Sequence, residues 1–274
     1  MRPESHRVLN RVGKKFAPTF SRVLNRRPLA GAVSMLSWYL AFIQGKGSGA
    51  GWDIGAETKA ALSVLEKRPG LVLFDVGANV GDWTVRMLAD LGEACTIYQF
   101  EPTRECQAVL KGQARPNVIL VPFAVGDTDG EAEIYSIAGV KAKSASLYAR
   151  GDTCFEDRQY VKERIAITTI DGFMEQHQIE RVDFMKMDIE GHELCALKGA
   201  FKALKRGAIA ALTFEFGTGN INSRTFFRDF WDCLIPLDYR IFRICPGGVL
   251  MPVDAYYEDL EYFRGATNYL AIHA

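Results

Sequence analysis

Residues 75–81, which read DVGANVG, decide the fold of this chain, because they join an apolar run at 71–76 to a helical pattern at 82–91. A strand, a glycine-rich loop and a helix in this order are typical of parallel α/β sheets, in which ligands bind at the carboxyl ends of the strands. Gly77 allows a sharp turn and the close approach of a ligand, and Gly81 allows close packing of the helix start. The first N–H groups of that helix are expected to be open to an anion.

The rest of the chain alternates between short apolar runs and helical patterns. Apolar runs predict strands at 94–100, 118–124, 182–187 and 208–216. Helical patterns follow at 103–113, 170–176, 193–204 and 224–234. This alternation predicts an α/β fold with helices on both faces of a mostly parallel sheet. Further strands are predicted at 131–137 and 164–169, and the runs at 239–245 and 267–272 predict an antiparallel edge, since no clear helix separates them.

The spacing of the glycines distinguishes between cofactors. A dinucleotide-binding loop reads G-x-G-x-x-G, but Asn79 stands where the middle glycine would be, so the pattern here is G-x-x-x-G. This substitution disfavours NAD or FAD. It favours a cofactor that brings a small carboxylate and an amine to the loop, and Asp75, at the strand end, is expected to bind the ammonium group.

Two further acids follow the next two predicted strands. Glu101 comes 20 residues after Gly81, in the sequence Phe100-Glu101-Pro102, where an acid accepts hydrogen bonds from two ribose hydroxyls. Asp127 follows the third strand, where an adenine would lie. The alternatives are that Glu101 caps the helix that begins at residue 103 and that Asp127 is an ordinary turn residue. The order of loop, acid and acid favours S-adenosylmethionine.

These residues resemble the FkbM family of S-adenosylmethionine-dependent methyltransferases. The matching stretches are DVGANVG (75–81), FEP (100–102), AVGD (124–127), KMDIEGHE (186–193) and FEF (214–216). The resemblance covers residues 71–274 and implies a Rossmann-like class I methyltransferase fold. It also implies O-methylation, often of a sugar or natural-product hydroxyl. By motif position it implies that the cofactor-binding residues include Gly77, Asn79, Gly81, Glu101 and Asp127.

A second group of polar residues follows the predicted strand at 182–187. A hydroxyl acceptor has a high pKa, so methyl transfer to it calls for a base or a metal. Asp188 is the first candidate for a general base or a metal ligand, and His192 is the second candidate for the base. Glu215, at the end of the next strand, is expected to face the same crevice, unless it binds only a backbone amide or an arginine.

Glu190 and Glu193 lie in the same motif. Together with Asp188 they are candidate carboxylate ligands for a divalent cation such as Mg²⁺. The alternative is that both glutamates only stabilise the N-terminus of the following helix. The polar loop at 138–160 is expected either to be solvated or to contact the acceptor through Lys141, Lys143, Ser144, Ser146 and Arg150.

Composition restricts the classes of protein. The 274 residues are 48% apolar, which excludes a disordered, collagen-like or disulfide-scaffold protein, and the balance of 33 basic and 33 acidic residues gives no indication of nucleic-acid binding. The six cysteines are scattered without zinc-finger spacing, which is typical of a reducing compartment and predicts a cytoplasmic protein.

The first 55 residues are expected to form an extension to a methyltransferase domain at 56–274. Residues 1–30 hold eight Lys and Arg against Glu4, a net charge of +7. The apolar segment at 29–44 is shorter than the ~20 residues of a membrane-spanning helix. The favoured interpretation is that this helix packs on the domain or on a second copy of the chain, and the alternative is that it lies on a membrane surface.

The sequence therefore predicts a methyltransferase that uses S-adenosylmethionine and acts on a hydroxyl-bearing small molecule or glycan. Two alternatives stay open. One is an NAD-dependent oxidoreductase on a similar fold. The other is a non-catalytic adaptor that keeps the fold and binds partners through residues 1–45.

Overall fold

The computed structural model describes residues 5–49, 55–66, 68–137, 145–148 and 160–274. Of the residues named above as acceptor contacts in the polar loop, Lys141, Lys143, Ser144 and Arg150 lie outside these ranges.

An eight-stranded sheet forms the centre of the molecule, in the order β10-β9-β11-β8-β7-β1-β2-β3. Its parallel part consists of β3 (Val118–Val121), β2 (Cys95–Phe100), β1 (Leu71–Val76), β7 (Phe184–Met187) and β8 (Ala211–Gly217). Its antiparallel edge consists of β11 (Ala266–His273), β9 (Tyr239–Cys245) and β10 (Val249–Val253). The predicted α/β fold with an antiparallel edge is confirmed, and β10 is a strand that the sequence patterns did not show.

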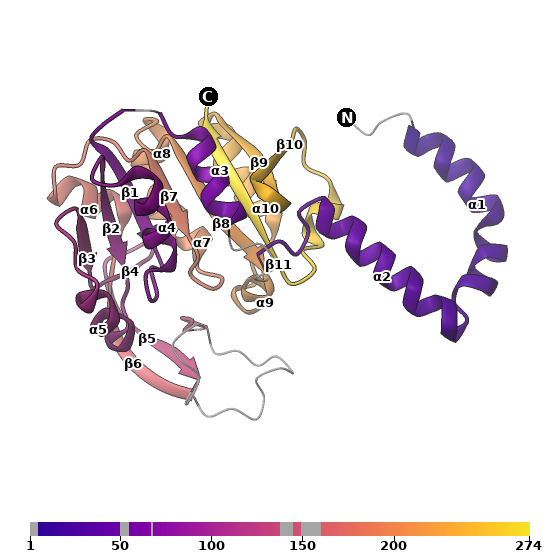
Figure 1. Ribbon diagram of the computed structural model, residues 1–274, viewed down its shortest axis with the longest axis horizontal. Coiled ribbons are helices and arrows are strands. Elements are labelled where there is room, and N and C mark those ends of the chain that lie inside the picture. The colour runs from indigo at the N-terminus through magenta and orange to yellow at the C-terminus, as the bar shows by residue number, and fades with distance from the viewer. Residues whose placement is uncertain (1–4, 50–54, 67, 138–144, 149–159) are drawn as a thin grey trace.

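Helices cover both faces of this sheet (Figure 1). The helices of the domain are α3 (Ala56–Val64), α4 (Asp82–Leu91), α5 (Arg104–Gly112), α6 (Ile170–Gln176), α7 (Glu193–Lys198), α8 (Phe201–Lys205), α9 (Thr218–Ser223) and α10 (Phe227–Leu234). Three short 3₁₀ turns complete them, at Ile235–Leu237, Pro246–Gly248 and Glu258–Glu261. The side chains of β1 point to both faces of the sheet and so contribute to two separate core clusters. Leu71 and Leu73 pack with α3 and α4 on one face, whereas Phe74 and Val76 pack with α6, α7, α8 and α10 on the other.

A smaller sheet of three strands has the order β4-β6-β5. It is made of β4 (Ala124–Val125), β5 (Gly130–Ile137) and β6 (Tyr160–Thr168), and Figure 1 shows β5 and β6 extending from one end of the domain. The single strand predicted at 118–124 is therefore two strands, which belong to different sheets.

Two predicted helices are shorter than the sequence patterns indicated. The helix predicted at 193–204 is interrupted at Gly199, whose carbonyl accepts the Asp171 N–H at 2.9 Å, and the Asp171 carboxylate in turn accepts the first N–H groups of α8. The helix predicted from residue 224 begins only at Phe227, because Arg224 has a φ of 55° and the Asp229 carboxylate accepts the Phe226 N–H. In both cases an aspartate fixes the new helix start.

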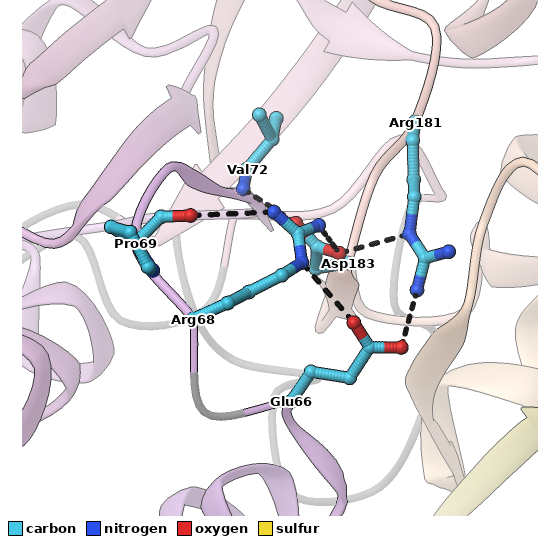
Figure 2. A network of polar contacts seen from close by, with 6 residues as sticks. All are labelled: Glu66, Arg68, Pro69, Val72, Arg181 and Asp183. Carbon is cyan, nitrogen blue, oxygen red and sulfur yellow. Dashed lines mark hydrogen bonds and ion pairs between the residues drawn. The ribbon is translucent and has the colours of Figure 1, made fainter.

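A polar network joins the amino ends of β1 and β7 (Figure 2). Asp183 is buried and accepts hydrogen bonds from Arg68 Nη2 at 2.5 Å, Arg181 Nε at 3.0 Å and the Val72 N–H at 2.9 Å. Glu66 binds both arginines from the solvent side, at 3.1 and 3.2 Å. The network therefore ties the segment after α3 to the two central strands, at the opposite ends of these strands from residues 77–81 and 188–193.

An extension of two helices, α1 (Ser5–Leu24) and α2 (Arg27–Ile43), projects from the domain (Figure 1). The apolar helix is not packed into the core of the domain, because α2 contains no buried residue, and its contact with the domain includes the Ser37 hydroxyl, which accepts from Arg264 Nη2 at 3.1 Å. The other part of the same expectation, packing on a second copy of the chain, stays a prediction. Within the described part of the chain, no helix has both the length and the apolar character needed to cross a bilayer.

Candidate cofactor and acceptor site

A cavity of about 310 Å³ lies at the carboxyl ends of β1, β2 and β7, where the strand order switches direction. Six of the residues singled out from the sequence line it, namely Gly77, Asn79, Glu101, Asp188, Glu190 and His192. Five others do not line it, namely Asp75, Gly81, Asp127, Glu193 and Glu215. The cavity therefore unites the first loop with Glu101 and with the loop after β7.

Close backbone contacts require the glycine at position 77. Its φ is 78°, and a Cβ on it would lie 2.0 Å from the Asp188 carbonyl oxygen. The N–H groups of Gly77 and Ala78 both donate to the Phe100 carbonyl at 3.0 Å, and the Asn79 N–H donates to Glu101. These three loop amides are thus used within the chain and are not open to an anion.

Glu101 is buried at the wall of the cavity and holds two elements. Its Oε2 accepts the Asn79 N–H at 2.9 Å, while its Oε1 accepts the N–H and the hydroxyl of Thr103, at 2.9 and 2.6 Å. Burial raises the pKa of this carboxyl, and the hydrogen bonds oppose that rise. Glu101 lines the cavity and also binds Thr103, the N-cap residue of α5, and its binding of ribose hydroxyls stays a prediction.

A row of polar side chains crosses three central strands on the face that α3 and α4 cover. Asp75, Lys186 and Thr213 occupy paired positions on β1, β7 and β8. Lys186 Nζ lies 3.4 Å from Asp75 Oδ1 and 3.7 Å from Asp188 Oδ2, and it donates to the Gly77 carbonyl at 3.0 Å. Burial lowers the pKa of Lys186, but the carboxylates around it outweigh this effect and raise the pKa above its ordinary value. The ammonium group that Asp75 contacts is therefore that of Lys186, which itself lines the cavity.

Glu57, from α3, is a cavity residue that the sequence reasoning missed. Its Oε1 accepts the Thr213 hydroxyl at 2.8 Å. Burial raises the pKa of Glu57 to about 7, against the opposing charge of Lys186. A pattern existed that would have indicated it, because Glu57, Ala60 and Ala61 share one face of the helix, and both alanines are buried. For Lys186 the indication was a charged residue that lies among the apolar residues Phe184, Met185 and Met187.

The turn after β7 is organised by Glu193. Its Oε1 accepts the N–H groups of Ile189 and Gly191, at 3.0 and 3.3 Å, and burial raises the pKa of this carboxyl to about 8. Glu190 and Gly191 both have positive φ, and a Cβ on Gly191 would lie 2.5 Å from the Gly219 carbonyl oxygen. Across the described residues no three His, Cys, Asp or Glu side chains are grouped to hold a metal, so the suggested Mg²⁺ site at Asp188, Glu190 and Glu193 is not supported.

The other candidate site residues are placed as follows. His192 lines the cavity with Nδ1 at 3.0 Å from the Tyr148 hydroxyl, and burial lowers the pKa of its imidazole. Glu215 is half-buried beside Gly49, and burial, together with the Asp188, Glu190, Glu193 and Glu57 carboxylates, raises its pKa well above the ordinary value. Asp127 is exposed. The assignments of Asp75, Gly81 and Asp127 to the cofactor and of Glu215 to catalysis stay predictions.

Comparison with known proteins gives one family. Residues 75–241, more than half of the chain, match the family described as the Methyltransferase FkbM domain. No curated protein matches the chain.

Several solved structures are similar in fold. The FkbM methyltransferase of Methylobacillus flagellatus KT superposes with a TM-score of 0.50 at 17% identity, over 76% of this chain and 45% of that chain. A SAM-dependent O-methyltransferase of Thermotoga maritima gives 0.40 at 11% identity, over 79% and 64% of the two chains. Fibrillarin of Aeropyrum pernix, solved with natively bound S-adenosyl-L-methionine, gives 0.39 at 15% identity, over 79% and 74%. This chain spans less than half the length of the Methylobacillus protein, and at this identity the likeness shows the fold.

Proposed function

Because the chain belongs to the FkbM methyltransferase family, we propose that it transfers a methyl group from S-adenosylmethionine to a hydroxyl of a sugar, a glycan or a natural product. The observation that carries this proposal is the buried Glu101 carboxylate, which the Asn79 amide holds at the cavity wall. Oε2 accepts one hydrogen bond there and has a second lone pair for a ribose hydroxyl.

The other cavity walls suit the remaining parts of this cofactor. Phe123, Val125, Ile134 and Leu147 give an apolar surface of the kind that an adenine ring packs against. Asp188 brings a carboxylate to the same cavity and favours the cationic ammonium and sulfonium groups, and Glu57 adds a second carboxyl group that can accept a hydrogen bond from the ammonium. The residues present therefore fit S-adenosylmethionine.

When bound, S-adenosylmethionine supplies a methyl group that its sulfonium already activates for displacement. The chain's own task is to orient the acceptor and to take the hydroxyl proton. Asp188 suits this second task, since it lines the cavity and its side chain is 48% exposed, so an acceptor can reach it. Lys186 supports Asp188 from behind with a positive charge 3.7 Å away.

The competing cofactor assignment, NAD, is disfavoured by the hydrogen bonds of the loop. A pyrophosphate needs open backbone N–H groups at this position. The amides of Gly77, Ala78 and Asn79 are already used by Phe100 and Glu101.

Calorimetric titration tests the cofactor proposal. We expect S-adenosylhomocysteine to bind the wild-type chain, and Glu101→Gln to weaken this binding about 10- to 100-fold, because the neutral amide accepts a hydroxyl less strongly than a carboxylate does. Glu105→Gln, a change of the same kind on the exposed side of α5, is the matched control and leaves the affinity unchanged. Binding of NAD in place of S-adenosylhomocysteine contradicts the proposal, as does the absence of any binding.

The acceptor class is tested with labelled S-adenosylmethionine and fractionated glycans, lipids and small molecules. The expected product is a methyl ether, identified by mass spectrometry after hydrolysis. Asp188→Asn is expected to lose at least about 100-fold in transfer rate while its affinity for S-adenosylhomocysteine is kept. A label found on carbon or nitrogen contradicts O-methylation.

A further inference from the structure

The two-helix arm, residues 5–43, carries an apolar surface that the domain does not cover. In α1 the exposed residues Phe16, Phe20, Val23 and Leu24 recur at helical spacing. In α2 the exposed apolar residues are Leu29, Val33, Met35, Leu36, Tyr39, Leu40 and Ile43. Leu36 is 58% and Leu40 is 54% exposed, in a helix with no buried residue. A surface of this extent is unusual for a chain that has no partner.

The charge of the arm has a single sign. Between residues 5 and 52 the sequence contains no Asp or Glu. The arm itself contains seven basic residues, namely Arg7, Arg11, Lys14, Lys15, Arg22, Arg26 and Arg27. Lys46, which follows the arm, is paired with Asp259 at 3.4 Å. Arg22, Arg26 and Arg27 are exposed at the junction of the two helices. Apolar helix faces that are flanked only by cations complement a partner surface that carries negative charges on its outside and an apolar layer beneath them.

The root of the arm, residues 44–49, is fixed to the antiparallel edge of the sheet. The Gly49 N–H donates to the Ala266 carbonyl at 2.9 Å, and the Gly47 N–H donates to the Thr267 hydroxyl at 3.0 Å. The Ser48 hydroxyl donates to the Ile244 carbonyl at 3.0 Å. Ala266 pairs with Gly217, the last residue of β8, so the arm leaves the domain at the edge of the sheet where the parallel strands end and the cavity lies.

We infer that the arm docks this protein on the surface of an anionic lipid bilayer. The basic residues bind the lipid head groups, and the apolar side chains of α1 and α2 enter the boundary between head groups and acyl chains. A second copy of the arm is a poorer partner, because it brings the same positive charge and no acid. The root attaches the arm near the edge of the sheet that holds the cavity, and docking does not depend on the proposed methyl transfer.

Vesicle co-sedimentation of the full chain tests this inference. Wild-type protein is expected to sediment with phosphatidylcholine vesicles that contain phosphatidylglycerol, and not with phosphatidylcholine alone. Replacing the three junction residues, Arg22→Gln, Arg26→Gln and Arg27→Gln, is expected to weaken binding roughly a hundredfold. The matched control removes three exposed charges from the domain, Lys202→Gln, Lys205→Gln and Arg206→Gln, and keeps wild-type binding.

The apolar contribution is separated by Leu36→Ser with Leu40→Ser, which keeps every charge and is expected to lose vesicle binding. Equal sedimentation with neutral and anionic vesicles, or wild-type binding by the arm variants, overturns the inference. So does a wild-type dimer in sedimentation equilibrium that becomes monomeric with Leu36→Ser and Leu40→Ser, because a second copy then covers the arm. Titration with S-adenosylhomocysteine is expected to be identical for wild-type and arm variants, so failure here is distinguishable from failure of the proposed function.

Discussion

At the scale of single residues, the site depends on one buried cation shared among several acids. Side chains alternate along a strand, so Asp75, Lys186 and Thr213 on neighbouring strands all point to the face under α3. Burying Lys186 is unfavourable by itself, and the carboxylates beside it offset that penalty. Glu57, on α3, contacts this row of side chains through the hydrogen bond that it accepts from the Thr213 hydroxyl. The acids nearest the cavity are therefore held in place by Lys186, which lines the cavity together with Glu57 and Asp188.

The raised pKa of Glu57 predicts how stability changes with pH. The folded carboxyl keeps its proton to about pH 7, whereas the carboxyl of the unfolded chain releases it near its ordinary pKa of 4.5. Between these values the folded state binds more protons, so this group makes the wild-type protein less stable as the pH rises from 4.5 to 7. The Glu57→Gln variant has no ionisable group at this position, so this contribution to the fall in stability is absent from it.

We therefore expect Glu57→Gln to gain stability relative to the wild type between pH 5 and pH 8, by on the order of 2 kcal/mol. The measurement is urea unfolding at the two pH values. The exposed Glu175→Gln serves as control and shows no such change. An equal pH dependence in Glu57→Gln and the wild type contradicts the raised pKa.

The residues that could be predicted from the sequence are those whose role is local. Gly77 and Glu101 each directly follow the end of a strand, in the motifs at 75–81 and 100–102, and both line the cavity. Glu57 and Lys186 come from different elements. Only the packing of α3 on the sheet brings them together, because Glu57 binds Thr213 of β8, which pairs with Lys186 of β7. Asp127 follows a strand in the expected order, but it is exposed, because that strand belongs to the smaller sheet.

At the scale of elements, ends are fixed by single carboxylates. Asp171 begins α8, Asp229 begins α10 and Glu193 closes the turn before α7. The apolar runs predicted the strands at 71–76 and 239–245 with their bounds, because the apolar residues of each run are contiguous or alternate within the run itself. It did not give the break at Gly199, because that break depends on a contact with Asp171, 28 residues earlier in the chain.

Removing Asp183 is expected to destabilise the amino ends of β1 and β7. Asp183→Ala leaves the Val72 N–H without its acceptor and two arginines without their shared carboxylate. We expect a loss of about 2 kcal/mol in the free energy of unfolding, measured by urea denaturation. Glu66→Ala removes only the exposed side of the network and is expected to lose less than about 1 kcal/mol. Similar losses for the two variants would show that burial of Asp183 is unimportant.

At the scale of the whole molecule, the chain separates what builds the core from what extends beyond it. Helices from residue 56 onward cover both faces of the large sheet. Helix α2 of the arm contains no buried residue and so adds nothing to either face. The sequence alone did not resolve this, because an apolar helix has the same pattern whether it packs on its own domain or on an external surface. The structure resolves it, because the residues that pack on both faces of the sheet come from residue 56 onward and α2 contains no buried residue.

Removal of residues 1–43 is therefore expected to leave the domain intact, with a melting temperature within about 2 °C of the full chain. Removal of residues 1–49 is the informative contrast, because it also takes away the root. Buried Arg243 then loses the Gln44 carbonyl, which it binds at 3.2 Å, and Ala266, Thr267 and Ile244 lose their partners. We expect this second truncation to melt at least about 4 °C lower, since each buried polar group left unpaired costs about 1–3 kcal/mol. Equal melting of the two truncated chains would show that the root is as dispensable as the arm, and the fixed direction of the arm relative to the cavity would then have no structural basis.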